Sequence, residues 1–251
     1  MLGATDGGSR SADSITMGVN GSWALPHGRV VFRPAAKGRS EQSERARRIF
    51  NVAVAAVALV VLSPLMLLIA IAVKLTSPGP VFYKQTRVGV DRRSTTGGNF
   101  RRRVDYGGKL FTIYKFRTMY VAEKDAAQVW ARKGDPRITP LGRVLRKFRL
   151  DELPQLINVL RGEMNVVGPR PEQPEIFIQL REQIDRYQER QRVLPGITGW
   201  AQINQRYDET LDDVRRKVSL DLDYASRRSV TEDLRIMLKT LPVMAFRDYG
   251  L

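Results

Sequence analysis

An uncharged apolar segment at residues 51–73, NVAVAAVALVVLSPLMLLIAIAV, dominates the hydropathy pattern. Roughly 20 apolar residues suffice for a helix to cross a bilayer, so this segment is long enough to enter a membrane. Ser63 and Pro64 lie in its middle, and a proline inside a helix removes a backbone hydrogen bond and kinks or breaks the helix. The pattern therefore predicts a membrane helix with a break at these two residues.

Positively charged residues flank this segment on both sides. They are Arg45, Arg47 and Arg48 before it, and Lys74, Lys84, Arg87, Arg92 and Arg93 after it. The positive-inside rule places such flanks on the cytoplasmic side, and a straight span cannot satisfy both. A helix–break–helix that enters the membrane and returns on one face satisfies both. In a kinked single span the charge count would be uninformative, and the residues alone leave the two topologies open.

The segments after the membrane helix predict a pair of strands. They are residues 77–89, SPGPVFYKQTRVG, and residues 109–119, KLFTIYKFRTM, joined by a basic, glycine-rich loop at 91–106. The two-residue period of the second strand places Lys115 and Arg117 on one face, roughly 7 Å apart. Two cations on a strand face are commonly just solvated. The functional alternative is a pair of phosphate ligands.

The remaining periodicity is helical. It predicts helices at 119–133, from Pro140 after the cap Thr139, at 176–192, at 211–226, and after Ser229, whose spacing to Glu232 forms a capping box. The last helix carries an apolar stripe, namely Leu234, Met237, Leu238, Leu241 and Met244. We favour a core position for this stripe over contact with the membrane surface. The predicted fold class is α+β and mostly helical.

The order of these segments predicts three regions. Residues 1–44 are rich in Gly, Ser, Ala and Arg and lack periodicity, so we expect a disordered basic tail. Residues 45–76 hold the membrane segment, which starts too late to be a secretory signal. Residues 77–251 are numerous enough to form a domain with its own core.

Composition restricts the chemistry that the chain can perform. It has 42 Lys and Arg against 26 Asp and Glu, a formal net charge of +16, which favours a polyanionic partner. It has no cysteine, and its only histidine is His27 in the tail. This composition disfavours thiol catalysis, zinc–cysteine sites, a Ser-His-Asp triad and multi-histidine metal sites. The groups that remain available for chemistry are carboxylates, Lys, Arg, hydroxyls and an oxygen-ligated metal.

The stretch RKFRLDELPQLINVLRGEM places Asp151 and Glu152 after a run of cations. With Pro154 two residues on, the ordinary interpretation is a helix start with an acidic cap. Alternatively, the same helix N-terminus attracts phosphate, and Arg143 and Arg146, three residues apart on the preceding helix, face one ligand. A carboxylate approaches a phosphate only when cations, a divalent metal or both screen the charge.

Two compact loops follow this stretch. In GPRP, Pro169 and Pro171 stiffen the backbone around Arg170, either as a structural turn or to hold an arginine against a phosphate. In LPGITGWAQIN, residues 194–204, Gly196 and Gly199 are free to adopt strained angles. Trp200 in this loop is expected in the core, with a stacking surface as the alternative.

Nucleic acid is the other partner that the basic charge suggests. A triple arginine at residues 101–103 would suit a phosphate backbone. However, the chain shows no recognisable nucleic-acid module, and an apolar anchor would confine it to the membrane. Anionic membrane lipids are the simpler partner for these cations, and we expect no nucleic-acid binding.

Taken in order, these motifs resemble the bacterial sugar transferase family, the monotopic polyprenyl-phosphate phosphoglycosyl transferases. The matching stretches are KLTSPGPVFYKQTRVG, GKLFTIYKFRTM, ITPLGRVLRKFRLDELPQLINVLRGEMNVVGPRPE, LPGITGWAQIN and LDLDYASRRSVTEDLRIMLKT. The resemblance runs from about Arg45 to the C-terminus and is to the short form, without a multi-span N-terminal region. It implies a re-entrant membrane helix broken at Ser63–Pro64, a small β-hairpin, amphipathic interfacial helices and a cytoplasmic catalytic domain at 77–251.

The resemblance also implies a reaction: transfer of a sugar-1-phosphate from a UDP-sugar to a polyprenyl phosphate at the cytoplasmic face of the bacterial inner membrane. The family's dyad falls on Asp151 and Glu152. Asp151 would attack the β-phosphorus of the donor, UMP would leave, and polyprenyl phosphate would attack the aspartyl-phosphosugar. The dyad would hold Mg²⁺. Substrate-binding candidates are Lys115, Arg117, Arg146 and Arg170 on family motif positions, together with Arg143 and with Gln202 in LPGITGWAQIN.

The chain departs from the family pattern at two places. The loop at 91–106 is longer and more basic than the usual connection, and Asp223 takes a position that is usually aromatic. Three alternatives remain: another activated donor, a catalytically silent scaffold, which would not need the dyad, and a membrane-tethered nucleic-acid binder. The motifs encode neither the sugar nor the glycan pathway, and they leave the oligomeric state open, a homo-oligomer included.

Overall fold

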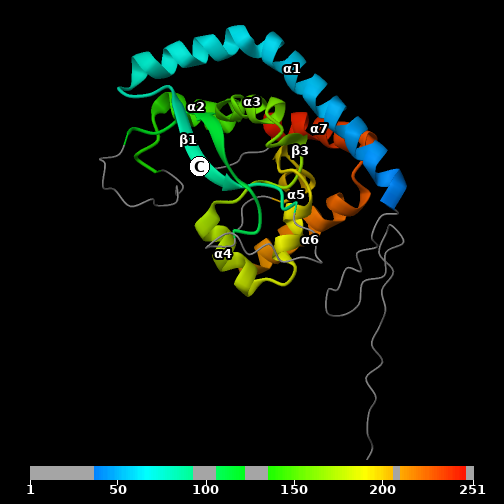
Figure 1. The fold of residues 1–251 in the computed structure, drawn as a ribbon. Coiled ribbons are helices and arrows are strands. Elements are labelled where there is room, and N and C mark those ends of the chain that lie inside the picture. Colours follow the sequence, from blue (N-terminus) through cyan, green and yellow to red (C-terminus); the bar gives the residue numbers. More distant parts are fainter. Residues whose placement is uncertain (1–36, 93–105, 122–134, 206–209, 247–251) are drawn as a thin grey trace, which may run out of the picture. The chain divides into compact units, whose positions relative to one another are not determined.

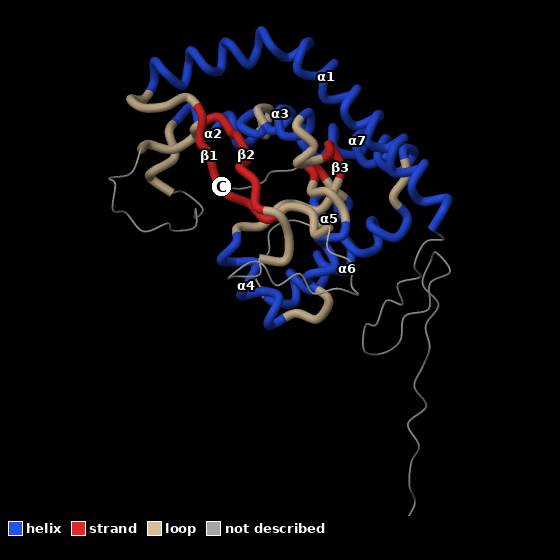
Figure 2. The backbone as a smooth tube through the Cα atoms, in the orientation of Figure 1, coloured by secondary structure: helices blue, strands red, loops and turns tan. Residues whose placement is uncertain are grey.

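A computed structural model describes residues 37–92, 106–121, 135–205 and 210–246, with side chains from 41 to 244. The helices are α1 (Lys37–Thr76), α2 (Pro140–Lys147), α3 (Gln155–Leu160), α4 (Pro174–Gln183), α5 (Trp200–Asn204), α6 (Leu211–Arg227) and α7 (Val230–Phe246), with 3₁₀ turns η1 (Leu150–Glu152) and η2 (Tyr187–Arg192). The strands are β1 (Phe82–Val88), β2 (Leu110–Phe116), β3 (Asn165–Val167) and β4 (Gly196–Thr198). Figure 2 shows helices around two small sheets, so the mostly helical α+β prediction is confirmed.

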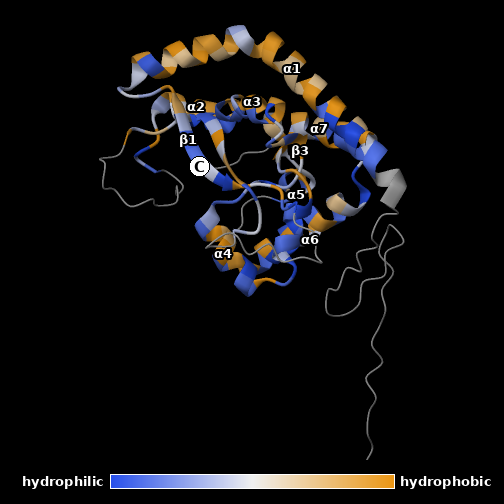
Figure 3. Cartoon of the chain, in the orientation of Figure 1, coloured by the Kyte–Doolittle hydropathy of each residue, from blue (hydrophilic) through white to orange (hydrophobic). Residues whose placement is uncertain are grey.

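The long helix α1 is apolar enough to enter a membrane. Its stretch Glu41–Thr76 qualifies by length and composition as a membrane span, and only 11% of its most apolar window is buried. Figure 3 shows apolar residues along most of this helix. Its exposed apolar side chains include Val57, Val60, Val61, Leu67, Leu68 and Leu75. Within the described residues, no other helix meets the same criterion.

The predicted break at Ser63–Pro64 is not an interruption of the helix. Pro64 lies inside α1, which continues without a non-helical residue to Thr76. Proline cannot donate to the carbonyl four residues earlier, that of Val60. The Ser63 hydroxyl donates to this same carbonyl at 2.8 Å, so the acceptor keeps a partner. In Figure 1 the helix bends and arches over α2 and α3.

Both halves of α1 pack against the domain that follows it. Ala55 in the first half belongs to a buried cluster with Phe111 of β2 and Leu156 of α3. Val73 near the end belongs to another, with Phe116 of β2. Residues 35–251 accordingly form one compact unit. The boundary expected at 76/77 is therefore not a boundary in packing, and helix already covers 37–44 of the expected tail; residues 1–36 lie outside the described part.

The two predicted strands form an antiparallel hairpin. β1 pairs with β2 in a register that sets Tyr83 opposite Lys115. Most of the loop predicted at 91–106 lies outside the described residues. A second sheet, in which β3 pairs with β4 in parallel, was not predicted. Its strands are three residues long, too short for hydropathy to reveal a period.

Several helices begin where their capping residues predict. Thr139 accepts a hydrogen bond from the N–H of Gly142, with Pro140 at the first helical position of α2. Thr210 and Asp213 form a capping box at the start of α6. Ser229 Oγ accepts from the N–H of Glu232, 3.1 Å away, at the start of α7. The caps named from the sequence therefore located α2 and α7 correctly, whereas the capping box of α6 was not predicted.

Two helix predictions were wrong in part. The helix expected at 176–192 ends at Gln183, Ile184 is extended, and η2 follows. Arg186 has φ 63°, a left-handed conformation that cannot continue an α-helix. The helix expected at 119–133 does not begin at Met119, which pairs with Ile138 in an isolated bridge. Tyr120 and Val121 are not helical either, and residues 122–133 lie outside the described residues.

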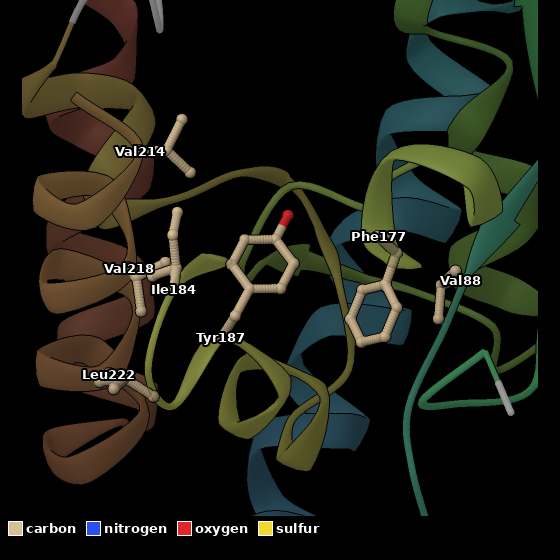
Figure 4. Packing of buried hydrophobic residues seen from close by; sticks show 7 residues of the cluster. All are labelled: Val88, Phe177, Ile184, Tyr187, Val214, Val218 and Leu222. Atoms are coloured by element: carbon tan, nitrogen blue, oxygen red, sulfur yellow. The ribbon is translucent and has the colours of Figure 1, made fainter. Parts of the chain in front are cut away.

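A hydrophobic cluster joins α6 to the first hairpin. Figure 4 shows Tyr187 between the apolar face of α6 and Phe177 of α4, with Val88 of β1 beyond. The N–H of Val88 donates to the carbonyl of Glu172 at 2.9 Å. This cluster therefore fixes the chain directly after the GPRP loop.

Candidate active site

The two candidate carboxylates lie in the 3₁₀ turn η1, between α2 and α3. Asp151 is 7% exposed and Glu152 is 4% exposed. Arg149 precedes the turn with φ 52°, a left-handed conformation that is uncommon outside glycine. The cap position of α3 is Pro154, and no side chain caps that helix. The acidic-cap interpretation is therefore wrong, because the carboxylates belong to a separate turn that precedes the helix.

Glu152 is surrounded by cations from three segments. Its Oε1 lies 2.8 Å from Lys115 Nζ and 2.8 Å from an Arg170 guanidinium nitrogen. Its Oε2 lies 3.7 Å from Arg149. Burial by itself would raise the pKa of the Glu152 carboxyl, but attraction to Arg170, Lys115 and Arg149 outweighs it and holds the pKa well below its usual value. Glu152 is therefore an ionised and firmly held carboxylate.

Asp151 has a different environment. In the part of the chain that the structure describes, no side chain donates a hydrogen bond to its carboxylate or forms an ion pair with it. Burial raises the pKa of the Asp151 carboxyl from 3.8 to about 6; Lys115 opposes this rise, and the charge of Glu152 adds to it. Adjacent carboxylates with opposite pKa shifts are typical of sites where two acids have different roles.

The GPRP loop holds Arg170 beside Glu152 through backbone contacts. Gly168 N–H donates to Thr198 O and Gly196 N–H to Pro169 O, each at 2.9 Å. A Cβ on Gly196 would lie 2.0 Å from the nitrogen of Gly168. Gly199 has φ −171°, which is ordinary extended backbone, and neither Gly196 nor Gly199 has a positive φ. The expectation of strained angles was wrong, and close backbone approach explains these glycines.

Sequence reasoning missed a buried ionic cluster behind this loop. Arg190, 1% exposed, donates to Asp221 at 2.7 Å and to the carbonyl of Arg170 at 3.2 Å. Lys217 bonds Glu172 at 2.8 Å. Asp221 lies seven residues after Val214, on the apolar face of α6. A charge on an apolar helix face was the available signal for this cluster.

Lys115 and Arg117 have different partners, although the strand period placed them on one face. Lys115 contacts Glu152. The guanidinium of Arg117 instead donates to the carbonyl and hydroxyl of Ser77 at 2.7 and 2.8 Å, and to Val73 O at 3.4 Å. These contacts stabilise the C-terminus of α1. They favour a structural role for Arg117 over phosphate binding.

The remaining predicted ligands lie at varying distances from the dyad. Arg146 donates to Thr118 Oγ1 at 2.8 Å and is close enough to Asp151 to lower its pKa. Arg143 is exposed, and a ligand shared by the two arginines stays a prediction. Gln202 donates to Ile197 O, and its buried Oε1 has no partner among the described groups.

Metal-binding capacity at the dyad is limited. Among the described residues, no group of three or more His, Cys, Asp or Glu side chains is placed to hold a metal. Mg²⁺ commonly uses one or two carboxylates together with substrate phosphates. The uncommitted carboxylate of Asp151 fits such a shared site.

An apolar cavity of about 280 Å³ borders the dyad. Glu152, Arg149 and Gln202 are part of its wall. Its apolar wall includes Val54 of α1, Leu156 of α3, Ile197 of β4, and Met237, Leu241 and Met244 of α7. The apolar stripe of α7, which was expected in the core, is therefore only partly buried. Leu234, Leu238 and Leu241 are exposed, whereas Met237 and Met244 are half-buried.

Two other expectations concerned the C-terminal region. Trp200 is half-buried, and the cationic groups of Arg227, Lys239 and Arg235 lie 4.5, 5.3 and 6.0 Å from its ring centroid. It also packs against the buried cluster that contains Val167 and Ile236, so the expected core position is confirmed in part. Asp223 pairs with Arg227 at 3.0 Å on the surface of α6, so the departure at this position affects the helix surface.

Known proteins resemble this chain over most of its length. UDP-glucose:undecaprenyl-phosphate glucose-1-phosphate transferase of Escherichia coli (strain K12) is 42% identical over 197 residues, 78% of this chain and 39% of that protein. UDP-N-acetylgalactosamine-undecaprenyl-phosphate N-acetylgalactosaminephosphotransferase of Aeromonas hydrophila is 40% identical over 195 residues, 78% of this chain and 42% of that protein. Exopolysaccharide production protein ExoY of Sinorhizobium fredii (strain NBRC 101917 / NGR234) is 36% identical over 231 residues, 92% of this chain and 96% of that protein.

The chain thus spans about two fifths of the first two relatives and nearly all of the third. The sequence profile of the family described as Bacterial sugar transferase matches residues 42–247, which include the dyad, the GPRP loop and most of α1. This match agrees with the order of motifs from the membrane helix to α7. The chain belongs to the bacterial sugar transferase family.

Proposed function

We propose that this protein transfers a sugar-1-phosphate from a UDP-sugar to a polyprenyl phosphate through a covalent intermediate on Asp151. The names of the relatives support the donor and acceptor classes, because they specify undecaprenyl phosphate together with UDP-glucose or UDP-N-acetylgalactosamine. Because these sugars differ between relatives, the panel of UDP-sugars described below identifies the sugar for this chain. The name of the S. fredii relative supports a place in exopolysaccharide production.

The contrast between Asp151 and Glu152 is the observation that carries the proposal. A nucleophilic carboxylate needs lone pairs that no neighbouring cation occupies, and Asp151 meets this condition. Glu152 has both oxygens engaged by Arg170, with Lys115 sharing one of them. This environment supports assigning Asp151 as the nucleophile and Glu152 as the group that holds the cations in place.

The proposed reaction has two displacements. An Asp151 oxygen bonds to the β-phosphorus of the donor, the bond from that phosphorus to the bridging oxygen breaks, and UMP departs. A phosphate oxygen of the polyprenyl phosphate then bonds to the same phosphorus, and the bond to Asp151 breaks, which restores the carboxylate. The bond between the sugar and its phosphate oxygen stays intact throughout. The anomeric configuration is therefore retained.

The cations around the dyad screen the negative charge of the phosphates. Lys115 and Arg170 lie against Glu152, and Arg146 influences Asp151, so positive charge borders the carboxylates. Mg²⁺, held by one oxygen of Asp151 together with the diphosphate, would supply further charge neutralisation and leave the other oxygen available for attack. Gln202 Oε1, buried without a partner among the described groups, would accept a hydrogen bond from a donor hydroxyl.

We further propose that α1 enters the membrane and returns on the cytoplasmic face. Arg47 near its start donates to Asp233 of α7 at 3.3 Å, and Arg117 contacts Ser77 directly after its end. One folded domain cannot bury its side chains on both sides of a bilayer. Contacts at both ends of the apolar segment therefore support a re-entrant helix over a single span.

Activity on a panel of UDP-sugars tests the proposed function. The full-length protein, supplied with undecaprenyl phosphate and Mg²⁺, should release UMP from at least one UDP-sugar and form the matching polyprenyl diphosphosugar. Asp151→Asn should abolish both products, whereas Asp223→Asn on the surface of α6 should retain them. Turnover by Asp151→Asn would contradict the assignment of Asp151 as the nucleophile. Full activity in excess chelator would contradict the proposed role of Mg²⁺.

A further inference from the structure

The apolar cavity beside the dyad has a reactive end and an open end. Arg149 and Glu152 line one part of it. Leu241 also lines it and is 64% exposed, which places an opening of the cavity at the surface of α7. The cavity therefore connects the surface of α7 with the residues that surround the proposed nucleophile.

The wall of this cavity suits a hydrocarbon better than a nucleotide sugar. Thr198 and Thr240, two of its polar members, hydrogen-bond each other at 2.8 Å, and Thr240 also bonds Ile236 O. Apart from Arg149, Glu152 and Gln202, the rest of the wall is aliphatic or thioether. Sugar and base hydrogen-bonding groups would remain unpaired against that surface, at a cost in free energy.

We propose that this cavity binds the isoprene units next to the phosphate of the polyprenyl acceptor, with Arg149 contacting the acceptor phosphate. This inference rests on the proposed function and adds to it the site of the second substrate. An acceptor of this class joins an anionic head to an apolar chain, and the cavity joins a cation to an apolar wall.

The dimensions and neighbours of the cavity agree with this occupant. A cavity of about 150 Å³ can hold benzene, so about 280 Å³ accommodates roughly ten carbon atoms, or two isoprene units. Val54 contributes a wall from α1, and Leu241 exposes apolar surface on α7 at the opening of the cavity. The remaining isoprene units can therefore continue from the cavity into the hydrocarbon of the bilayer.

The left-handed backbone of Arg149 gives this residue its place at the junction. Its carbonyl accepts from the N–H of Glu152 at 3.1 Å, which closes the turn, while its side chain lines the cavity. A phosphate beside Arg149 would lie next to Glu152, the residue directly after Asp151. In the second displacement its oxygen bonds to the phosphorus carried by Asp151, and the Asp151–phosphorus bond breaks.

A matched pair of substitutions on α7 tests the inference. Leu241 lines the cavity and Leu238 does not, yet their exposures are similar at 64% and 59%. Leu241→Trp should raise KM for the acceptor about tenfold by filling the opening, and Leu238→Trp should leave it unchanged. Farnesyl phosphate and undecaprenyl phosphate, each in detergent, should show the same increase, because only the units next to the phosphate enter the cavity.

Release of UMP in the absence of acceptor separates the two proposals. Leu241→Trp should carry out this first half-reaction at the same rate as the unmodified protein. That result would also demonstrate that the variant is folded. Met237→Trp, deeper in the same wall, provides a second filled cavity. The inference would be overturned if acceptor KM were unchanged in both cavity variants. It would also be overturned by an effect on KM confined to undecaprenyl phosphate, or by a folded variant that loses the first half-reaction. Absence of UMP release from the unmodified protein would overturn the proposed function instead.

Discussion

At the scale of single residues, neighbours from distant parts of the chain give two adjacent carboxylates different properties. Lys115 comes from β2 and Arg170 from the GPRP loop, and both contact Glu152. Asp151, one residue earlier, is buried without such partners. The sequence identified the pair but could not distinguish its members by local physics. The distinction depends on tertiary contacts that no local pattern contains.

We expect the acceptor-independent release of UMP to slow as pH falls through about 6. The proposed attack requires ionised Asp151, and burial raises the pKa of this carboxyl to about 6, so the reactive form is lost on the acid side of that value. Glu152→Gln should move the inflection to lower pH, because the charge of Glu152 contributes to the rise. The pH dependence of the single-turnover rate constant measures both, and an inflection that stays in place in Glu152→Gln would contradict this explanation.

Other residues show what sequence reasoning at this scale could not reach. Arg149 lies in the quoted stretch but was not selected, because its left-handed conformation and its position on the cavity are tertiary features. Arg117 was selected by its spacing from Lys115, yet it contacts the end of α1. Strand period predicts the face of a side chain and not its partner.

At the scale of elements, the predictable parts were those with local signals. Helices α2 and α7 were located by caps and apolar periodicity, and the hairpin by alternation. The turn η1 and strands β3 and β4 are three residues each, which leaves no period to detect. They exist because neighbouring segments hold them, and they position both the dyad and the GPRP loop.

The ionic cluster behind the GPRP loop should contribute strongly to stability. Asp221→Asn removes a carboxylate that pairs with the buried Arg190, and loss of one partner of a buried pair typically costs about 3 kcal/mol or more. Urea unfolding should show this loss. Asp223→Asn, two residues along α6, removes an exposed ion pair and should change stability by less than about 1 kcal/mol. Equal effects of the two substitutions would refute the role assigned to the cluster.

At the scale of the whole molecule, the apolar helix α1 and the domain that follows it form one unit. Arg47, Asn51 and Asp233 form a buried hydrogen-bonded group near the start of α1. The sequence predicted the apolar segment and its proline. The sequence analysis placed a domain boundary after the helix, however, because a hydropathy pattern does not reveal contacts between residues that lie more than 100 positions apart.

Cysteine accessibility tests the topology of α1. The chain has no cysteine, so Gln42→Cys before the apolar segment and Gln179→Cys on α4 provide unique labels at exposed positions. Both should react with a membrane-impermeant maleimide only after the cells are permeabilised. Labelling of one position in intact cells and of the other only after permeabilisation would indicate a single span.

The most direct test of the central claim is the intact mass of the protein after incubation with a UDP-sugar and Mg²⁺ in the absence of polyprenyl phosphate. A covalent intermediate predicts a mass increase equal to one sugar phosphate, mapped by peptide fragmentation to Asp151 and removed when polyprenyl phosphate is added. Asp151→Asn should show no increase, and Glu152→Gln should place any adduct on the same aspartate. An adduct on Glu152, or turnover of a competent donor without any adduct on Asp151, would contradict the account.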